Sequence, residues 1–540
     1  MQTTTRFALL LLSLGTVHAQ EILWSRTGVY DDYGFSEYLG VLGDLNGDGY
    51  DDLVDVVTSV IPASHTDLFF LSGRDGTTLR IKHGAPTPAP SYFRVWGTGD
   101  MNADGIPDYA TIILDAWGQR VILEIASGAD DRMIWRTSQP WSTLFGYGYA
   151  GNVDLDGDGR PDVLVTDVRT TYGTVYAFSN SGSLLYAWSP TSGTLAVGRS
   201  VAGVGDVDGD SCDDFVTGGF GPDTNGRVAL VSGRTGTLIR VAQGEPGDEI
   251  GHSVTGCGDV DGDGIPDFAS GNSDFMTLRC VVKVFSGATG APIYTLTGGP
   301  PQGNAFGWSI AGGADVDQDG VRDIVVGAHA EVYSGGEGAG YVFSGRDGSV
   351  LFREAPGGRE GFSVVTMPPQ PGSVFPYFLV TAPRYGDGGR LSALGRIRCF
   401  RGSPPGVQSF GKPGGTLATT PRIGLRDLGT GGVRIHLSGA EPGQPAALLL
   451  GLSRTLWAGL SLPLGLDPFG LPQAALLVSP DLLLWTTAGI AGTSRGYAYH
   501  DLPIPLAVPP GTFTLHGQWL CLGSNPATPG STSDALLWRH

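Results

Sequence analysis

The sequence predicts an all-β protein, in which a seven-bladed β-propeller is followed by a small β-sandwich-like C-terminal domain. Three observations predict this fold: an acidic ten-residue motif occurs six times, the copies are evenly spaced, and short apolar strands surround each copy. Apolar residues do not recur at helical spacing in these units, whereas short strands separated by Gly-rich turns are typical of repeated β-sheets.

The acidic motif first occurs as GDLNGDGYDD at residues 43–52. Five more copies follow, at residues 99–108, 153–162, 205–214, 258–267 and 314–323. Their first aspartates lie 52 to 56 residues apart, which is the regular period of a repeat architecture.

Each period contains four short strands. One strand precedes the motif, as in GRSVAGV, a second follows it, as in DIVVGAH, and two more resemble GTVYAFS and TLIRVAQ. Four-stranded units repeated around an axis are the blades of a β-propeller. Residues 361–383 supply a seventh unit with PPQPG in place of the acidic motif, so seven blades are expected.

The two ends of the repeat region indicate how the ring closes. The strand EILWSRTG at residues 21–28 has no unit before it, and the seventh unit runs short after GRIRCFRG at residues 395–402. We expect residues 21–28 to complete the seventh blade; the alternative is that VQSF at residues 407–410 fills that place.

Every copy of the motif has Asp or Asn at positions 1, 3, 5 and 9, whereas position 7 varies, as expected if only its backbone carbonyl is used. Hard oxygen atoms from a tight loop are ligands for Ca²⁺, and Gly at position 6 permits the sharp turn. Without a cation the clustered carboxylates would repel one another. An EF-hand is not expected, because position 12 lies within a strand and is not Glu in any copy. We therefore expect about six structural Ca²⁺ ions, held by Asp44, Asn46, Asp48, Tyr50 and Asp52; Asp100, Asn102, Asp104, Ile106 and Asp108; Asp154, Asp156, Asp158, Arg160 and Asp162; Asp206, Asp208, Asp210, Cys212 and Asp214; Asp259, Asp261, Asp263, Ile265 and Asp267; and Asp315, Asp317, Asp319, Val321 and Asp323.

These units resemble a known family. Stretches such as GDLNGDGYDDLVDVV and FGWSIAGGADVDQDGVRDIVVGAH are similar to FG-GAP repeats, the blades of the integrin α-subunit N-terminal propeller and of many secreted bacterial proteins. The resemblance covers roughly residues 21–405 and implies a seven-bladed propeller with Ca²⁺ in the loop between the first two strands of a blade. Two departures stand out: Ser211 replaces the usual Gly, which predicts a weaker fourth site, and the seventh blade is expected to bind no metal.

The ends of the chain predict its organisation and location. Arg6, an apolar run and the small-residue ending at Ala19 are typical of a secretory signal, so we expect a secreted, cell-surface or periplasmic protein. The expected parts are a signal peptide at 1–19, the propeller at 20–405, a linker at 406–421 and the C-terminal domain at 422–540. No later apolar run reaches the roughly 18 residues of a membrane span. A net charge of −20 argues against nucleic acid as a partner.

The loops between the second and third strands are the expected ligand-binding face, because the metal loops are committed to the other face. Six of these loops carry an aromatic residue, which either contacts a protein or glycan or only caps the blade edge: Trp117, Tyr172, Phe220, Phe275, Tyr333 and Tyr385.

Extracellular adhesion or recognition without catalysis is the function that the sequence favours. No G-x-S-x-G, H-E-x-x-H or C-x-x-C motif occurs, and the histidines are dispersed. The alternatives are a lectin-like carbohydrate binder and a polysaccharide-degrading enzyme; a deep pocket with a basic residue beside a tyrosine would favour the enzyme. Five cysteines are too few for a disulfide scaffold. Cys212 in the fourth acidic motif and Cys257 before the fifth belong to adjacent blades, and packing of these blades could bring the two thiols together in one disulfide.

Overall fold

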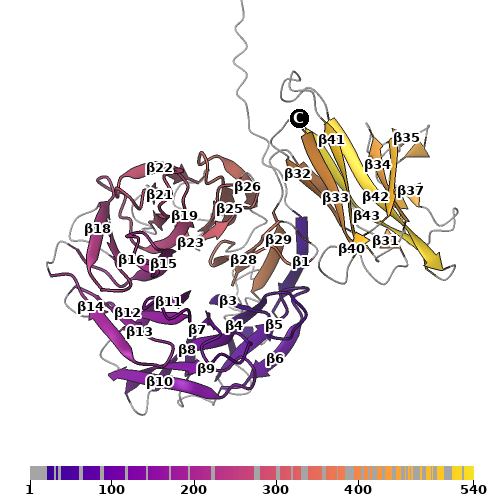
Figure 1. The fold of residues 1–540 in the computed structure, drawn as a ribbon. Helices are drawn as coiled ribbons and strands as arrows, with labels where there is room; N and C mark the ends of the chain where they lie inside the picture. The colour runs from indigo at the N-terminus through magenta and orange to yellow at the C-terminus, as the bar shows by residue number, and fades with distance from the viewer. Residues whose placement is uncertain are drawn as a thin grey trace, which may run out of the picture.

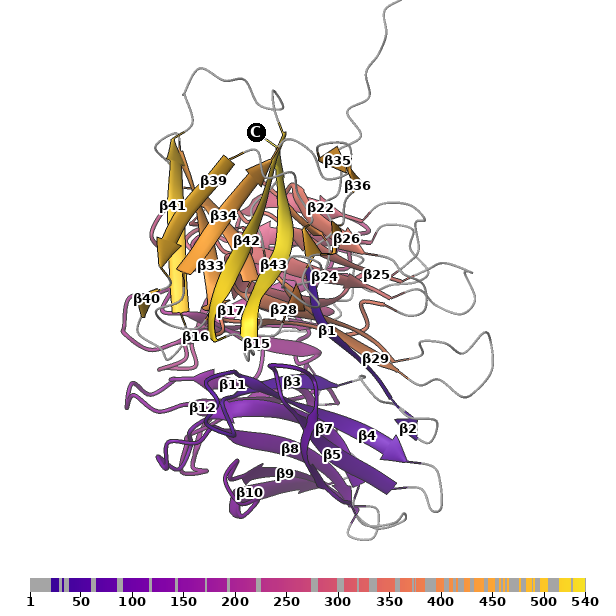
Figure 2. The ribbon, with the colours of Figure 1, turned by 90° about the vertical axis from the view of Figure 1, so that its right-hand side faces the viewer.

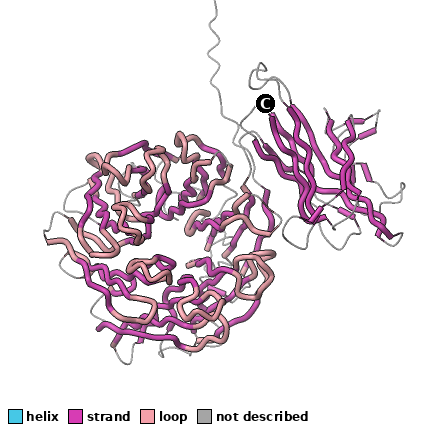
Figure 3. Tube along the Cα trace, in the orientation of Figure 1, coloured by secondary structure: helices cyan, strands magenta, loops and turns pink. Residues whose placement is uncertain are grey.

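A computed structural model describes residues 21–402 with short gaps, and beyond them only strands between residues 407 and 539. The gaps are at residues 29–31, 34–37, 60–64, 85–90, 116–118, 141–143, 170–171, 192–194, 220–224, 273–279, 299–304, 318–319, 330–337, 355–359, 372, 374, 384–394 and 403–406. All regular elements in the described residues are strands, as Figure 3 shows. Residues 1–19, the expected signal peptide, lie outside the described residues.

Seven antiparallel sheets form a ring, so the predicted seven-bladed propeller is confirmed (Figure 1). Blade 1 also contains a short strand, β2, beside β4. In chain order the blades are β2 (Asp32–Tyr33), β3 (Leu39–Gly43), β4 (Asp52–Ser59), β5 (His65–Leu71) and β6 (Thr78–Lys82); β7 (Ser91–Gly99), β8 (Asp108–Asp115), β9 (Arg120–Ala126) and β10 (Met133–Pro140); β11 (Phe145–Val153), β12 (Asp162–Asp167), β13 (Thr174–Phe178) and β14 (Leu184–Trp188); β15 (Ser200–Gly205), β16 (Asp214–Gly219), β17 (Arg227–Val231) and β18 (Leu238–Gln243); β19 (Ser253–Gly258), β20 (Asp267–Gly271), β21 (Val281–Phe285) and β22 (Pro292–Thr297); β23 (Phe306–Ala314), β24 (Asp323–Ala328), β25 (Ala339–Phe343) and β26 (Val350–Glu354); and β27 (Val364–Met367), β28 (Tyr377–Ala382), β29 (Arg396–Arg401) and β1 (Glu21–Thr27).

The strands of a blade differ in burial, which explains their composition. The second strands β12, β16, β20, β24 and β28 are buried at every residue, because neighbouring blades cover both of their faces. Apolar and small residues therefore predominate in these strands, as in DIVVGA of β24 and YFLVTA of β28. The outer strand β10 is half-buried or exposed along its whole length and therefore tolerates Arg136 and Ser138.

The hydrophobic core is divided into layers between adjacent blades. One layer joins blade 7 to blade 1 through Leu53, Leu71 and Leu379, all fully buried. Another joins blades 6 and 7 around Val325 and Phe378. Since each layer holds only two neighbouring blades together, the ring depends on the pairing that closes it.

The chain's first strand closes the ring, as predicted. Strand β1 pairs antiparallel with β29, from Glu21 opposite Arg401 to Thr27 opposite Arg396, and the two strands lie side by side in Figures 1 and 2. The alternative is excluded because β30 (Val407–Phe410), the VQSF segment, pairs with β43 (Thr528–Arg539) instead.

Beyond residue 406 the described residues are strands. The larger sheets have the orders β30-β43-β42-β34-β39 and β32-β33-β41-β40. The predicted linker, residues 406–421, contains β30 and β31, which both pair with β43. The β-sandwich and the domain boundaries stay predictions. The remaining strands are β31 (Gly414–Gly415), β32 (Arg422–Asp427), β33 (Gly432–Ala440), β34 (Pro445–Gly451), β35 (Leu456–Trp457), β36 (Leu460–Ser461), β37 (Leu464–Gly465), β38 (Ala475–Leu476), β39 (Leu482–Thr487), β40 (Gly489–Ile490), β41 (Gly496–Pro503) and β42 (Thr514–Asn525).

Candidate metal loops

Each acidic motif forms the loop between the first and second strands of its blade, at the end where the innermost strand finishes. In blade 5, for example, β19 ends at Gly258 and β20 begins at Asp267. All six loops lie within the described residues except for residues 318–319, which include the predicted ligand Asp319.

The first aspartate of a loop is enclosed by the backbone that follows it. In the fifth loop, Asp259 Oδ1 accepts hydrogen bonds from the Gly262 and Asp263 amides at 2.7 and 3.1 Å, and Oδ2 accepts one from the Gly264 amide at 2.8 Å. The same bonds wrap the first loop around Asp44 and the fourth around Asp206. These hydrogen bonds wrap the loop backbone around one carboxylate. They also offset part of the electrostatic repulsion between the carboxylates of the loop.

Positions 3 and 5 are held by shorter-range bonds. In the fifth loop the Asp263 amide donates to Asp261 Oδ1 at 3.2 Å, and the Ile265 amide donates to Asp263 Oδ1 at 2.9 Å. The amide of the position-7 residue is thus engaged, which leaves its carbonyl as the group that it can offer to a cation.

The aspartate at position 9 anchors the loop to the rest of the blade. Asp267 is fully buried, and its Oδ2 accepts the Val260 amide at 2.8 Å while its Oδ1 accepts the Gly287 amide at 2.9 Å. A side chain at Gly287 would approach the Pro266 carbonyl oxygen to 1.9 Å, so only glycine fits this contact. Equivalent bonds occur at Asp52, Asp108, Asp162, Asp214 and Asp323.

Position 6 adopts a left-handed backbone, as the preference for glycine predicts. Gly49, Gly159 and Gly264 have φ of 85°, 80° and 88°, and Ser211 has φ of 69° at the same place in the fourth loop. A residue with a Cβ pays about 1–2 kcal/mol in this region. The fourth loop therefore has the predicted backbone but carries strain that the others avoid.

Carboxylate oxygens come within 4.8 Å of one another in four of the loops: Asp154, Asp156 and Asp162; Asp206, Asp208 and Asp210; Asp259, Asp261 and Asp263; and Asp315, Asp317 and Asp323. The first two loops have Asn46 and Asn102 at position 3, where an amide oxygen replaces a carboxylate. Such sets of hard oxygens fit Ca²⁺.

The electrostatics of the loops also favour a cation. Burial, reinforced by the charges of neighbouring aspartates and partly opposed by backbone hydrogen bonds, raises the pKa of Asp162 to about 7 and that of Asp323 to about 8. Burial likewise raises the pKa of Asp52, Asp214 and Asp267 to about 6. A bound divalent cation would favour the ionised forms and remove this cost.

Most of the predicted ligand-binding aromatic residues lie outside the described part of the chain. Of the six, Tyr172 lies in the described part of the chain, where it is half-buried and its carbonyl accepts the Val197 amide at 3.0 Å. The other five lie outside the described residues: Trp117, Phe220, Phe275, Tyr333 and Tyr385.

The disulfide considered between Cys212 and Cys257 is absent, since both are buried free cysteines. Cys212 Sγ lies 3.6 Å from Arg234 Nη1. Cys257 packs in a core layer with Val260 and Ala269. The two thiols thus have different surroundings.

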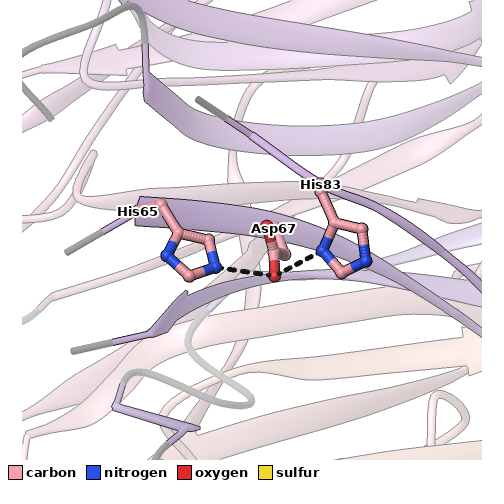
Figure 4. Close-up of side chains that lie close together, drawn as sticks. All are labelled: His65, Asp67 and His83. Carbon is pink, nitrogen blue, oxygen red and sulfur yellow. Dashed lines mark hydrogen bonds and ion pairs between the residues drawn. The ribbon is translucent and has the colours of Figure 1, made fainter. Parts of the chain in front are cut away.

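Strand pairing also brings together His65, Asp67 and His83, although the histidines are dispersed along the sequence. Asp67 Oδ2 lies between two imidazoles, 3.3 Å from His65 Nε2 and 3.2 Å from His83 Nδ1 (Figure 4). Asp67 Oδ1 accepts the Gly84 amide at 2.9 Å. The buried carboxylate thereby ties the start of β5 to the residues that follow β6.

A set of large side chains that no motif predicted faces the centre of the ring. Their positions are marked in the sequence by a Gly-x-Ser pattern near the start of the inner strands, in GRSV, GHSV, GWSI and GFSV. The glycines Gly198, Gly251, Gly307 and Gly361 have φ of 93°, 109°, 90° and 79°. Each turns the chain so that the next residue, which is Arg, His, Trp or Phe, lines a central pocket.

Comparisons with known proteins agree with the repeat architecture. Residues 154–217 match the model of the FG-GAP-like repeat, and residues 306–343 match that of the FG-GAP repeat. Integrin alpha-IIb of Homo sapiens is 33% identical over 251 residues, which cover 44% of this chain and 20% of that protein. Integrin alpha-PS2 of Drosophila melanogaster is 29% identical over 211 residues, which cover 33% of this chain and 15% of that protein.

The chain thus matches a fifth or less of the length of these two relatives. Among solved structures, the Dos1 propeller is 13% identical with a TM-score of 0.39, covering 65% of this chain and 74% of that chain. The resemblance that the motifs carry is confirmed by the repeat models and by the curated relatives.

Proposed function

Because this chain carries FG-GAP repeats similar to those of integrin α subunits, we propose that it is a secreted Ca²⁺-binding propeller that acts in adhesion or extracellular recognition without catalysis. Its organisation would be a signal peptide at 1–19, the propeller at 20–405, a linker and a C-terminal domain at 422–540. No helix in the described residues is both long and apolar enough to cross a bilayer.

The observation that carries this proposal is the repeated geometry of the acidic loops. Backbone amides converge on the first aspartate, the position-9 aspartate is buried, and four loops gather carboxylate oxygens within 4.8 Å. The cation would be structural: it would neutralise carboxylates between the first two strands of a blade. Six sites, each saturated to tenfold above its Kd, would together stabilise the ring by about 8 kcal/mol.

The Ca²⁺ component is tested with the mature protein, residues 20–540. We expect EDTA to lower the melting temperature by more than 10 °C and titration calorimetry to count about six ions. Asp259→Asn is expected to remove one ion from the count. Asp130→Asn, in the turn after β9, is a matched control and should leave it unchanged. A melting temperature that ignores EDTA would contradict the structural role.

The recognition component is tested on an array that combines extracellular matrix proteins and glycans, in millimolar Ca²⁺. Selective binding to any member supports recognition, and folded protein that binds none overturns it. Carbohydrate binding is the second candidate function, and the central pocket favours it.

A further inference from the structure

A pocket of about 450 Å³ lies at the centre of the ring, which is within the size range of small-ligand sites. Every blade contributes to its wall through a residue that lies within three residues of the start of its innermost strand. One such residue from each blade, in chain order, is Tyr38, Arg94, Tyr147, Arg199, His252, Trp308 and Phe362. All seven are half-buried, as expected of side chains that face an accessible hollow.

The pocket and the metal loops lie at opposite ends of the inner strands. Strand β15, for example, begins at Ser200 in the pocket wall and ends at Gly205, directly before the fourth loop. The pocket therefore opens on the face that carries the loops between second and third strands. A ligand there would not touch the Ca²⁺ loops.

Blades 1 to 4 give the pocket a cationic side. The Arg94 guanidinium lies 4.7 Å from the centre of the Tyr38 ring and 5.4 Å from that of Tyr147, and Arg199 Nη1 donates to the Tyr147 hydroxyl at 3.0 Å. Arg94 Nε is buried and has no hydrogen-bond partner among the described residues. The described residues of the pocket wall include neither Asp nor Glu. Two arginines thus face the pocket, although the chain as a whole has a net charge of −20.

Blades 5 to 7 give the pocket a flat, uncharged side. The Trp308 ring centre lies 4.7 Å from that of His252 and 5.6 Å from that of Phe362. His329 stacks on Phe362 with an interplanar angle of 7° and thereby supports it. Burial, followed by the charge of Arg199, lowers the pKa of His252 to about 3, so this imidazole is neutral at physiological pH.

We propose that the central pocket binds an acidic sugar residue, with its carboxylate against Arg94 and Arg199 and its pyranose ring against Trp308 and Phe362. Planar guanidinium groups bind carboxylates with paired, charge-assisted hydrogen bonds. The apolar C–H face of a pyranose packs well on aromatic rings. An isolated carboxylate, such as an acidic side chain, would use only the cationic side and leave the aromatic side exposed. This inference rests on the proposed recognition function and names its ligand class.

The test is an array of matched oligosaccharides bound by the full mature protein in millimolar Ca²⁺. Each acidic member is paired with its neutral counterpart: glucuronic acid with glucose, galacturonic acid with galactose, mannuronic acid with mannose, and sialylated with asialo glycans. We expect at least one acidic member to bind while its neutral counterpart does not. Equal binding of both members in every pair whose acidic member binds, or binding of no acidic member, would overturn the inference.

Variants locate the binding site for the acidic oligosaccharide found. Arg94→Gln is expected to weaken binding about 10- to 100-fold, because it removes a charged hydrogen-bonding group. Trp308→Ala should also weaken binding, whereas Trp308→Phe should retain most of it. Arg136→Gln removes the same charge from exposed β10 in the same blade as Arg94 and should have no effect. Melting temperatures exclude unfolding, and undiminished binding by both Arg94→Gln and Trp308→Ala would refute the pocket as the site.

Extracellular matrix proteins and an acidic peptide on the same array separate this inference from the proposed function. Binding to one of these alone would keep the recognition function and overturn the acidic-sugar site. Folded, Ca²⁺-loaded protein that binds nothing would overturn both.

Discussion

Trp24 donates its indole N–H to the carbonyl oxygen of Gly73 at 2.9 Å, and this bond joins blade 7 to blade 1 where the ring closes. The Trp24 ring also packs against the turn after β5, since a Cβ on Gly76 would lie 2.6 Å from it. Related links occur elsewhere: Trp135 donates to the Asn180 carbonyl, Tyr186 to Gly233 and Tyr294 to Gly345. An outer-strand side chain thus holds the next blade at several places around the ring.

Replacement of Trp24 should loosen the ring. Trp24→Phe keeps most of the buried surface but loses the hydrogen bond, which should cost about 1 kcal/mol of unfolding free energy. Trp24→Ala also leaves a cavity and should cost about 3–5 kcal/mol. Urea unfolding measures both. The exposed Leu184 of β14 supplies a control, since Leu184→Ala should change stability by less than about 0.5 kcal/mol. Equal stability of Trp24→Ala and the control would show that this closure contact is dispensable.

Ser211→Gly should stabilise the protein and strengthen its fourth loop. Ser211 has φ of 69°, so glycine would remove strain of about 1 kcal/mol. A higher melting temperature in EDTA and tighter binding of one Ca²⁺ ion in calorimetry are expected. Ser211→Ala keeps the Cβ and should bring neither gain. If it matches Ser211→Gly, the loss of the hydroxyl rather than the backbone is responsible.

His252 should make the protein less stable in acid. Burial and the charge of Arg199, with a smaller contribution from His329, lower its folded-state pKa to about 3. The unfolded chain, with an ordinary pKa of about 6.5, then binds one more proton between these values. The contribution of His252 to the free energy of unfolding is fully present above about pH 6.5. It falls as the pH decreases toward about 3, by up to about 1.4 kcal/mol per pH unit.

The comparison that isolates His252 is the difference between wild type and His252→Gln, with Ca²⁺ present throughout. Unfolding free energies from pH 7 to pH 4 should fall more steeply for the wild type. Parallel profiles would mean that this histidine does not stay neutral in the folded state.

Binding should occur without cleavage of the sugar. The pair of Arg199 and Tyr147 in a central pocket is the arrangement that would favour a polysaccharide-degrading enzyme, so turnover has to be measured. His252 is a poor general base there, because its pKa of about 3 is far from neutral pH. Elimination would remove the C5 proton, break the C4–O bond and create an ultraviolet-absorbing double bond beside the carboxylate. We expect no rise in absorbance with acidic polysaccharides; a steady rise that Tyr147→Phe abolishes would establish an enzyme.

The position and composition of the acidic loops were predictable because all their candidate ligands lie within ten consecutive residues. Local spacing alone sets which oxygens can converge, and the six motif copies together with the unit at residues 361–383 set the number of blades. The positive φ of Gly264 follows from the same local geometry, and so does that of Ser211. The anchoring role of position 9 could not be predicted from the motif alone. Asp267 accepts a hydrogen bond from the amide of Gly287, and two strands separate these residues along the chain.

The central pocket could not be derived from local pattern. Arg94 and Trp308 are more than two hundred residues apart in sequence, and only closure of the ring places them around one pocket. The same holds for Asp67 and His83, which strand pairing brings together, and for Cys212 and Cys257, of which the first lies beside Arg234 and the second packs with Val260 and Ala269.

The sequence by itself determined the repeat, the blade number and the loop chemistry, because each depends on residues that are neighbours along the chain. The tertiary structure decided that β1 rather than residues 407–410 completes blade 7, and that the inner strands surround a pocket that is cationic on one side and aromatic on the other. Both outcomes depend on which strands pair and pack across the whole ring, and this pairing is fixed by burial between blades rather than by local sequence.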